Sequence, residues 1–408
     1  MVDLLFKGTV KKAALFLFVS FFVYTLFAFE APVFDKNGAV KDDKKKTFGT
    51  QTSIQIVAEM KTGWNLGNTL DATNGKTLDS ETSWGQPKTT KQMFSGLAAS
   101  GIKTVRIPVS WHNHLIDNNY TIDPEWMKRV KQIVDWAIDA DLFVILNIHH
   151  DNYSQNRKLP DKKSGYYPTD ENFTQSEAFL VNVWSQISLA FNNGYDEHLI
   201  FEILNEPRLC GTKEEWYFDK KSKLSLEAAA NVNKLNQACL DVIRSSGGNN
   251  RQRIVCVTGL QASPNSVLAE QFKLPEDKEK NRLLVSVHMY SPYNFAMESP
   301  GVRVFTKTME AELNAVFRQL HENFVSKGYP VIIDEYGATN KDNLEERVKW
   351  FRFFIKQSRS YGMMCCLWDN GNYVLSGKDY SEHFGYYNRT KQTWYFPEII
   401  AVIREEAR

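Results

Sequence analysis

Residues 198–206 read HLIFEILNE, an apolar run typical of a buried strand that stops abruptly at the polar pair Asn205 and Glu206. Seven further short runs rich in Val, Ile and Phe occur along the chain, and segments of helical period separate them. The eight predicted strands span residues 63–68, 103–109, 142–150, 198–206, 253–259, 283–290, 330–336 and 363–368. Strands that are apolar throughout and separated by helices form a parallel sheet covered on both faces. Eight such units predict an α/β fold, the closed (β/α)8 TIM barrel.

The segment at residues 124–141 illustrates the predicted helices. Pro124 occupies a permitted position in the first turn. The residues expected on its buried face are Trp126, Val130, Ile133, Val134 and Ala137. A doubly wound open sheet is the alternative fold. The first strand carries Gly63 and Gly67 but not the G-x-G-x-x-G loop that an open dinucleotide-binding fold uses, so we favour the barrel.

The N-terminus has the pattern of an export signal. Lys7, Lys11 and Lys12 precede an uncharged apolar run at residues 13–29. We therefore expect residues 1–29 to be a signal peptide and the protein to be secreted or held at the cell surface. An uncleaved anchor is the alternative, and only then would the chain contact a membrane. We expect residues 30–50 to be a flexible linker because they are rich in Lys and Asp, and residues 51–408 to be a single barrel domain.

Charge and cysteine content exclude several classes of function. The 49 Lys and Arg against 48 Asp and Glu leave no net charge to attract nucleic acid, so we expect a neutral partner. The five cysteines show no C-x-x-C pair and no accompanying His spacing. Cys365 and Cys366 are adjacent in a predicted strand and point to opposite faces. We expect free buried thiols, with no disulfide framework, no metal and no cofactor.

Almost every predicted strand ends in a titratable or hydrogen-bonding side chain. In a closed parallel barrel these ends gather around one mouth. The residues at the strand ends are Arg106 and Trp111, His149 and His150, Asn205 and Glu206, His288 and Tyr290, Glu335, and Trp368. Taken singly, each is more often a solvated or structural residue than a catalytic one. Because burying so many polar groups together is costly, their convergence favours a functional site.

Two carboxylates on separate strands, Glu206 and Glu335, suit the cleavage of a neutral acetal. Glycoside hydrolysis needs one carboxylic acid to protonate the leaving oxygen and one carboxylate to attack or stabilise the oxocarbenium-like centre. We expect the negative charge of the nucleophile to raise the pKa of the acid, so that the acid keeps its proton. We expect Arg106 and the Tyr290 hydroxyl to keep the nucleophile ionised.

Seven motifs, in chain order, resemble those of glycoside hydrolase family 5, and most of all its subfamily 4 of endo-β-1,4-glucanases and xyloglucanases. The motifs are GWNLGNTLDA, VRIPVSW, ILNIHH, FEILNEPR, VSVHMYSPYNFA, IIDEYGA and LWDNGN, within residues 63–394. The resemblance implies a retaining endo-β-1,4-glucanase that hydrolyses cellulose, mixed-linkage glucan or xyloglucan. An endo-β-mannanase or xylanase on the same fold is the alternative.

Residue roles carried over from this resemblance follow the motifs. Glu206 would be the acid/base and Glu335 the nucleophile. Asn205 would bind the sugar 2-hydroxyl, Trp368 would form the floor beneath the cleaved sugar, and Asn68 would contact a more distant sugar. The supporting hydrogen-bond shell would comprise Arg106, His149, His150, His288 and Tyr290. Tyr336 stands where the family commonly has Phe, and we expect little effect because the ring is kept.

Aromatic side chains in loops are candidates for sugar platforms, since sugar rings present apolar faces. Trp84, Trp111 and Trp216 lie in predicted loops, and for them a platform role and a packing role are both open. The tryptophans predicted on helix faces, which are expected to be core residues, are Trp126, Trp136, Trp184 and Trp350.

Two rival functions keep the barrel. A metal-dependent hydrolase would use His149, His150 and His288 as ligands, but it would also need a ligand pair on the first strand, which GWNLGN lacks. An inactive glycan-binding barrel would use only the aromatic side chains, and the intact pair of carboxylates argues against it. We expect a monomer whose partner is the polysaccharide substrate.

Overall fold

The computed structural model of the chain describes residues 45–153, 164–373 and 382–408. The predicted signal segment at residues 1–29, and the predicted linker up to residue 44, lie outside the described residues. The described part belongs to one compact unit, Asp42–Arg408. Among the helices described, none combines the length and the apolar character needed to cross a membrane.

Eight parallel strands close into a barrel in chain order, which confirms the predicted (β/α)8 fold. The strands are β1 (Thr62–Asn65), β2 (Thr104–Ile107), β3 (Phe143–Asn147), β4 (Leu199–Glu202), β5 (Val255–Val257), β6 (Leu283–His288), β7 (Val331–Tyr336) and β8 (Met364–Leu367). Several are shorter than predicted. β4 ends at Glu202, four residues before Glu206, because the polar residues of these segments leave the sheet to form the rim of the barrel. A small antiparallel pair, β9 (Tyr387–Asn388) and β10 (Thr393–Trp394), follows β8.

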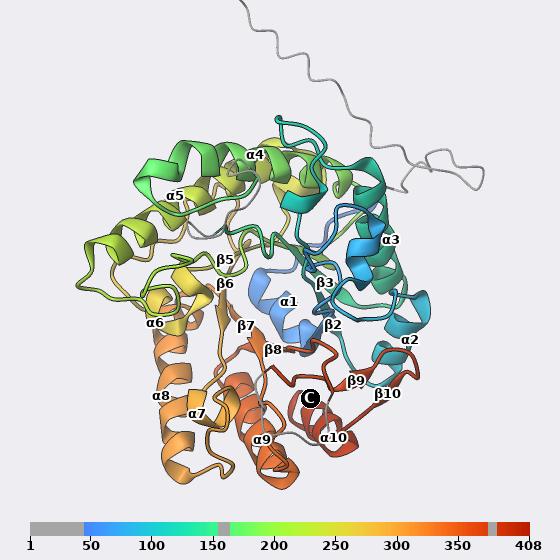
Figure 1. Cartoon of the computed structure of the whole chain (residues 1–408), viewed down its shortest axis with the longest axis vertical. Helices are drawn as coiled ribbons and strands as arrows, with labels where there is room; N and C mark the ends of the chain where they lie inside the picture. Colours follow the sequence, from blue (N-terminus) through green and yellow to red (C-terminus); the bar gives the residue numbers. More distant parts are fainter. Residues whose placement is uncertain (1–44, 154–163, 374–381) are drawn as a thin grey trace, which may run out of the picture. The chain divides into compact units, whose positions relative to one another are not determined.

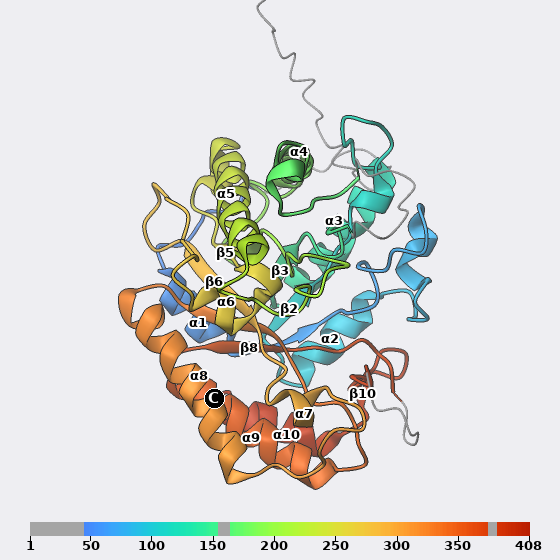
Figure 2. The ribbon, with the colours of Figure 1, turned by 60° about the vertical axis from the view of Figure 1, so that its left-hand side comes forward.

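Helices surround the barrel, except for α1 (Ser53–Met60), which lies at the centre of the view in Figure 1. The others are α2 (Lys91–Ala99), α3 (Pro124–Asp139), α4 (Phe173–Ala190), α5 (Lys223–Ser245), α6 (Pro264–Val267), α7 (Tyr293–Ala296), α8 (Lys307–Asn323), α9 (Leu344–Ser360) and α10 (Pro397–Glu406). Figure 2 shows α4 beside α5 on one flank, and α8, α9 and α10 together on another. The predicted face of α3 is buried, and the Asp123 side chain caps its first turn by accepting from the Glu125 N–H.

The barrel interior changes from apolar to polar along the strands. α1 packs under the amino ends of the strands, where Ile56, Val57 and Met60 join a cluster of interior side chains. The other members of this cluster are Phe143, Ile145, Ile200, Ile254, Cys256, Leu284, Ile332, Met364 and Cys366. Because strand side chains alternate, the next interior layer is set two residues further on, and it is polar: Asn147, Glu202, Ser286 and Asp334. The apolar layer thus packs the amino-terminal half of the barrel, and the polar side chains lie toward the carboxyl ends of the strands.

Part of the predicted linker is held against the barrel. The Lys46 N–H donates to the Asn193 carbonyl at 2.9 Å, and the Gly49 N–H donates to Glu197 at 2.8 Å. Phe48 lies against the guanidinium of Arg253, with 5.7 Å between the Arg253 carbon and the ring centre. Residues 46–49 of the predicted linker therefore contact the barrel domain through backbone hydrogen bonds and the buried Arg253 side chain. All five cysteines are free and buried, as predicted.

Candidate active site

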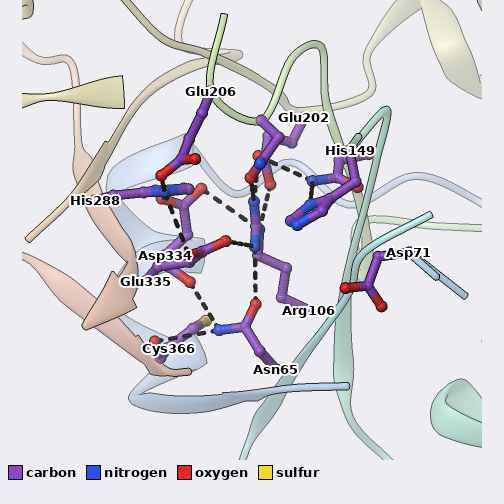
Figure 3. Close-up of polar contacts among 12 residues, drawn as sticks. Asn65, Asp71, Arg106, His149, Glu202, Glu206, His288, Asp334, Glu335 and Cys366 are labelled. Atoms are coloured by element: carbon purple, nitrogen blue, oxygen red, sulfur yellow. Dashed lines mark hydrogen bonds and ion pairs between the residues drawn. The ribbon is translucent and has the colours of Figure 1, made fainter. Parts of the chain in front are cut away.

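A β-bulge in β7 brings Asp334 and Glu335 to the same side of the strand. β6 and β7 pair in register up to Val287 and Ile333, after which His288 pairs with Glu335 and skips Asp334. The bulged carbonyl of Asp334 accepts a hydrogen bond from Asn65 Nδ2 at 2.8 Å. A bulge can re-aim a side chain that strand alternation would send outward. Both carboxylates therefore face the barrel mouth (Figure 3).

Arg106, on β2, is the centre of the site and is fully buried. Its Nε and Nη2 donate to the two Glu202 oxygens at 2.6 and 2.8 Å, and its Nη1 donates to Glu335 Oε1 at 2.7 Å. The amide oxygens of Asn205 and Asn65 accept from Nη2 and Nη1 at 2.6 and 2.9 Å. Burial alone would lower the pKa of Arg106, but the surrounding carboxylates outweigh it and raise that pKa. The guanidinium thus stays charged and holds the polar layer together.

Glu335 and Glu206 both approach one nitrogen of His288, Nδ1. The Tyr290 hydroxyl donates to Glu335 Oε2 at 2.9 Å, and His288 Nδ1 lies 3.4 Å from the same oxygen. His288 Nδ1 is also 2.8 Å from Glu206 Oε1. One carboxylate oxygen of Glu206 lies within 4.8 Å of one of Glu335. The two acids predicted from distant parts of the chain therefore meet at the same nitrogen of one imidazole.

The protonation of this group differs from the expectation stated above. Burial lowers the pKa of His288, but the charges of Glu335, Glu206 and Asp334 and the hydrogen bond to Glu206 outweigh burial and raise that pKa to about 9. Burial raises the pKa of Glu206, but the hydrogen bond and charge of His288 outweigh it and lower the pKa to about 2. Burial and the charge of Glu206 raise the pKa of Glu335. The charges of His288 and Arg106 lower it, but they offset only part of this increase. These directions oppose the expectation that Glu206 holds the proton in the free protein, because the hydrogen bond and charge of His288 lower the pKa of Glu206.

Asn205 and the other two histidines are held differently from His288. Asn205 gives its amide oxygen to Arg106, which leaves its Nδ2 as the donor for a ligand. His149 Nδ1 lies 3.1 Å from Asn147 Nδ2, and the same Nδ2 donates to Glu202 at 3.2 Å. Within the described part of the chain, the His149 and His150 rings make no hydrogen bond to Glu206 or Glu335. Burial lowers the pKa of both rings, that of His150 to about 4, so both are neutral.

The predicted aromatic platforms have different positions in the structure. Trp368 is partly exposed and its ring lies parallel to that of His149, with centres 5.9 Å apart. Trp84 is also partly exposed, 5.5 Å from the His150 ring. Trp216 is 63% exposed and lies under the Arg208 guanidinium at 4.0 Å. These three rings are open to a ligand.

Trp111 is not a platform, because it is 0% exposed. Its indole N–H donates to the Asn147 carbonyl at 3.0 Å and its backbone N–H donates to Asp151 at 2.9 Å, which turns the ring into the core. Asn68 is partly exposed with a φ of 54°, and its backbone N–H donates to Asp71 at 3.0 Å. Of the helix tryptophans, Trp126, Trp184 and Trp350 are fully buried, and Trp136 is partly buried against the core.

Sequence reasoning missed four buried members of the site: Asn65, Asn147, Glu202 and Asp334. Each lies inside a predicted strand, whereas the predicted site residues came from the strand ends. A charged residue within an apolar run, as in FEIL and IIDE, was the available signal. A buried charge of this kind needs a partner, and Arg106 is that partner for Glu202.

The three histidines do not form the metal site that the rival function requires. One ligand atom each of Asp71, His149 and His150 lie within 4.8 Å of one another, and similar groups surround His288 without including the other two histidines. The Asp71 carboxylate already accepts the Asn68 and Thr69 backbone N–H groups. No such group combines all three histidines within the described residues, and the absence of a metal and of a cofactor stays a prediction.

Comparisons with known proteins agree with the site. Residues 69–374 match the family model described as Cellulase (glycosyl hydrolase family 5). Endoglucanase B of Ruminococcus albus is 42% identical over 361 residues, which cover 88% of this chain and 82% of that protein. A GH5-4 broad specificity endoglucanase from Ruminococcus champanellensis, solved with bound cellotriose, superposes with a TM-score of 0.80 at 38% identity and covers 88% of this chain and 100% of its own. Another such endoglucanase, from Clostridium longisporum, gives a TM-score of 0.78 at 38% identity, over 88% and 99% of the two chains. The chain therefore belongs to glycoside hydrolase family 5.

Proposed function

We propose that this protein is a retaining endo-β-1,4-glucanase in which Glu335 is the nucleophile and Glu206 the acid/base. The observation that carries the proposal is the approach of their carboxylate oxygens to within 4.8 Å. Retaining glycosidases have carboxyl groups about 5–5.5 Å apart, whereas inverting enzymes leave roughly 6.5–9.5 Å for a water molecule. The separation supports direct attack by one carboxylate.

In the first step, Glu335 attacks the anomeric carbon while Glu206 protonates the departing oxygen. The proton starts on His288 and passes from Nδ1 to Glu206 Oε1 across 2.8 Å, which leaves the imidazole neutral. Arg106 and Tyr290 direct both oxygens of Glu335 through hydrogen bonds of 2.7 and 2.9 Å. Arg106 and Tyr290 thus orient Glu335 toward the anomeric carbon, and His288 lies within hydrogen-bond distance of the acid Glu206.

In the second step, water cleaves the glycosyl ester of Glu335. Glu206 has given up its proton and can take one from the water, so one residue serves both steps. The charge of Glu335 helps to hold the pKa of His288 up, and esterification removes that charge. His288 therefore competes less for the proton while the ester exists.

The substrate is a β-1,4-linked glucan: cellulose, mixed-linkage glucan or xyloglucan. Two of the relatives are called GH5-4 broad specificity endoglucanases, and one of these was solved with cellotriose, which supports a glucan and assignment to subfamily 4. The exposed rings of Trp368, Trp84 and Trp216 offer apolar surfaces for sugar faces. Endo-β-mannanase or xylanase activity is the alternative within the same fold.

The decisive experiment measures products from carboxymethyl cellulose, barley glucan, tamarind xyloglucan, glucomannan and xylan. We expect reducing sugar from the glucans, with the β anomer appearing first by proton NMR. An initial α anomer would refute the retaining mechanism, and activity confined to mannan or xylan would refute the glucanase assignment. Glu335→Gln should lose at least 1000-fold in kcat and still bind cellotetraose; binding by the wild type without any release of sugar would instead support a glycan-binding barrel.

We also propose that the protein is exported, since its substrate is a polymer found outside cells. The basic residues before the apolar run at residues 13–29 support a signal peptide. N-terminal sequencing of the mature protein from its host tests this. A new N-terminus near residue 30 would support cleavage, and an intact N-terminus in the membrane fraction would support the anchor.

A further inference from the structure

Asp334 is a buried carboxylate that the steps above do not use. It is 0% exposed and lies in the bulge of β7, one residue before Glu335. Its Oδ2 accepts from the Ser286 hydroxyl at 2.6 Å and lies 3.8 Å from Arg106 Nε. A buried carboxylate is costly unless something balances it. Its position therefore calls for an explanation beyond packing.

The other oxygen of Asp334 faces His288. Asp334 Oδ1 lies 3.5 Å from His288 Nε2, and both atoms are buried. Neither has a hydrogen-bond partner within residues 45–153, 164–373 and 382–408. The opposite nitrogen of the ring, Nδ1, contacts Glu206 at 2.8 Å. Asp334, the imidazole and Glu206 thus form a line, which Figure 3 shows.

We propose that Asp334 is a positioning residue of the reaction, whose carboxylate faces Nε2 of His288 and keeps a proton on the imidazole within reach of Glu206. The inference rests on the proposed acid role of Glu206. Asp334 itself does not touch the reacting atoms; it acts through the ring.

The charges around His288 are consistent with this role. The groups that face or adjoin the ring are Glu202 from β4, Glu206 from the segment after β4, Asp334 and Glu335 from β7, Arg106 from β2, His149 after β3, and Tyr290 after β6. Arg106 is engaged by Glu202 and Glu335, so its charge is already balanced. Burial and the charge of Glu202 raise the pKa of Asp334 to about 7, so above neutral pH Asp334 is ionised beside a charged imidazole.

Replacing Asp334 with Asn tests the proposal. The substitution keeps the shape and removes the negative charge, so the proton shared by His288 and Glu206 is held less tightly. At 3.5 Å, Coulomb's law gives a shift of about one pKa unit even at the dielectric constant of water. We expect the basic limb of the pH profile of kcat/KM, measured on an aryl β-cellobioside, to move down by about one pH unit or more.

Ser286→Ala is the matched control, because it removes the hydrogen bond to Asp334 Oδ2 and leaves the charge. The control should keep its basic limb within about 0.3 pH unit of the wild type. A folded D334N protein with an unmoved limb overturns the proposal. An equal shift in both variants also overturns it, since loss of local structure would then be the cause.

A measurement without turnover separates this inference from the proposed function. The 15N resonances of His288, one of eight histidines, report its titration directly. We expect the free wild-type ring to titrate well above the ordinary value of about 6.5 and to fall in D334N. A wild-type ring that titrates at or below the ordinary value overturns the proposal, whether or not the protein hydrolyses glucan. If D334N does not fold, Asp334→Ser makes the same charge change with a smaller side chain, and the same two outcomes apply.

Discussion

Removing Glu202 should destabilise the protein strongly, although Glu202 is not one of the two proposed catalytic acids. Its oxygens accept from Arg106 at 2.6 and 2.8 Å, and both side chains are fully buried. Removing one partner of a buried pair costs about 3–5 kcal/mol, because the other charge stays buried and uncompensated. Arg106 keeps Glu335 at 2.7 Å, so we expect the lower end of this range, about 3 kcal/mol, for Glu202→Ala.

Urea unfolding followed by tryptophan fluorescence measures this loss. With an m value of about 3 kcal/mol/M, the midpoint should fall by about 1 M. The matched control is Glu279→Ala, which removes the partner of Arg251 from an ion pair of 2.8 Å whose Arg251 side chain is 72% exposed. We expect no measurable change in the control, because solvent screens the pair. A midpoint for Glu202→Ala that falls by less than about 0.3 M would refute the argument that burial of Arg106 makes Glu202 indispensable.

Three further predictions concern the acid/base, the aromatic rings and metals. Glu206→Ala should lose activity and recover part of it with azide on aryl glycosides, yielding a β-glycosyl azide by NMR; an α product contradicts the mechanism. Trp216→Ala should raise KM for long cello-oligosaccharides several-fold with an unchanged unfolding midpoint, because its ring is exposed, whereas Trp111→Ala should cost about 3–5 kcal/mol of stability, because its ring is buried. A loss of stability in Trp216→Ala, or a raised KM with unchanged stability in Trp111→Ala, would contradict the roles given to the two rings. Dialysis against EDTA should leave the hydrolysis rate unchanged, and a loss that Zn²⁺ or Ca²⁺ restores would revive the metal-dependent rival.

Local sequence pattern was sufficient to predict the barrel. Eight apolar runs separated by helical segments can bury both faces of a sheet in only a few ways, and parallel topology brings the ends of the strands together. This reasoning also placed Glu206, Glu335, Arg106 and His288 in one site, since each lies in the carboxyl-terminal half of a strand or follows it. The strand ends and the positions of the rim residues were less accurate, because β4 stops four residues before Glu206.

The orientation of the Trp111 ring and the pKa values of His288 and Glu206 depend on tertiary structure. Trp111 lies in a segment that sequence pattern marks as a loop, and only the Asn147 carbonyl from the neighbouring strand shows that its ring turns inward. The bulge in β7 depends on pairing with β6, and it turns Glu335 to the same side as Asp334, whose Oδ1 lies 3.5 Å from His288 Nε2.

The amino-acid sequence by itself determined the strand order and the identity of the groups that reach the mouth, because period and composition are local properties. Tertiary structure decided which acid is charged. The pKa of a buried group depends on every charge within a few ångströms, and Asp334, His288 and Glu206 come from three different strand segments. The surrounding carboxylates raise the pKa of His288, and the 2.8 Å contact between its Nδ1 and Glu206 exists only in the folded barrel.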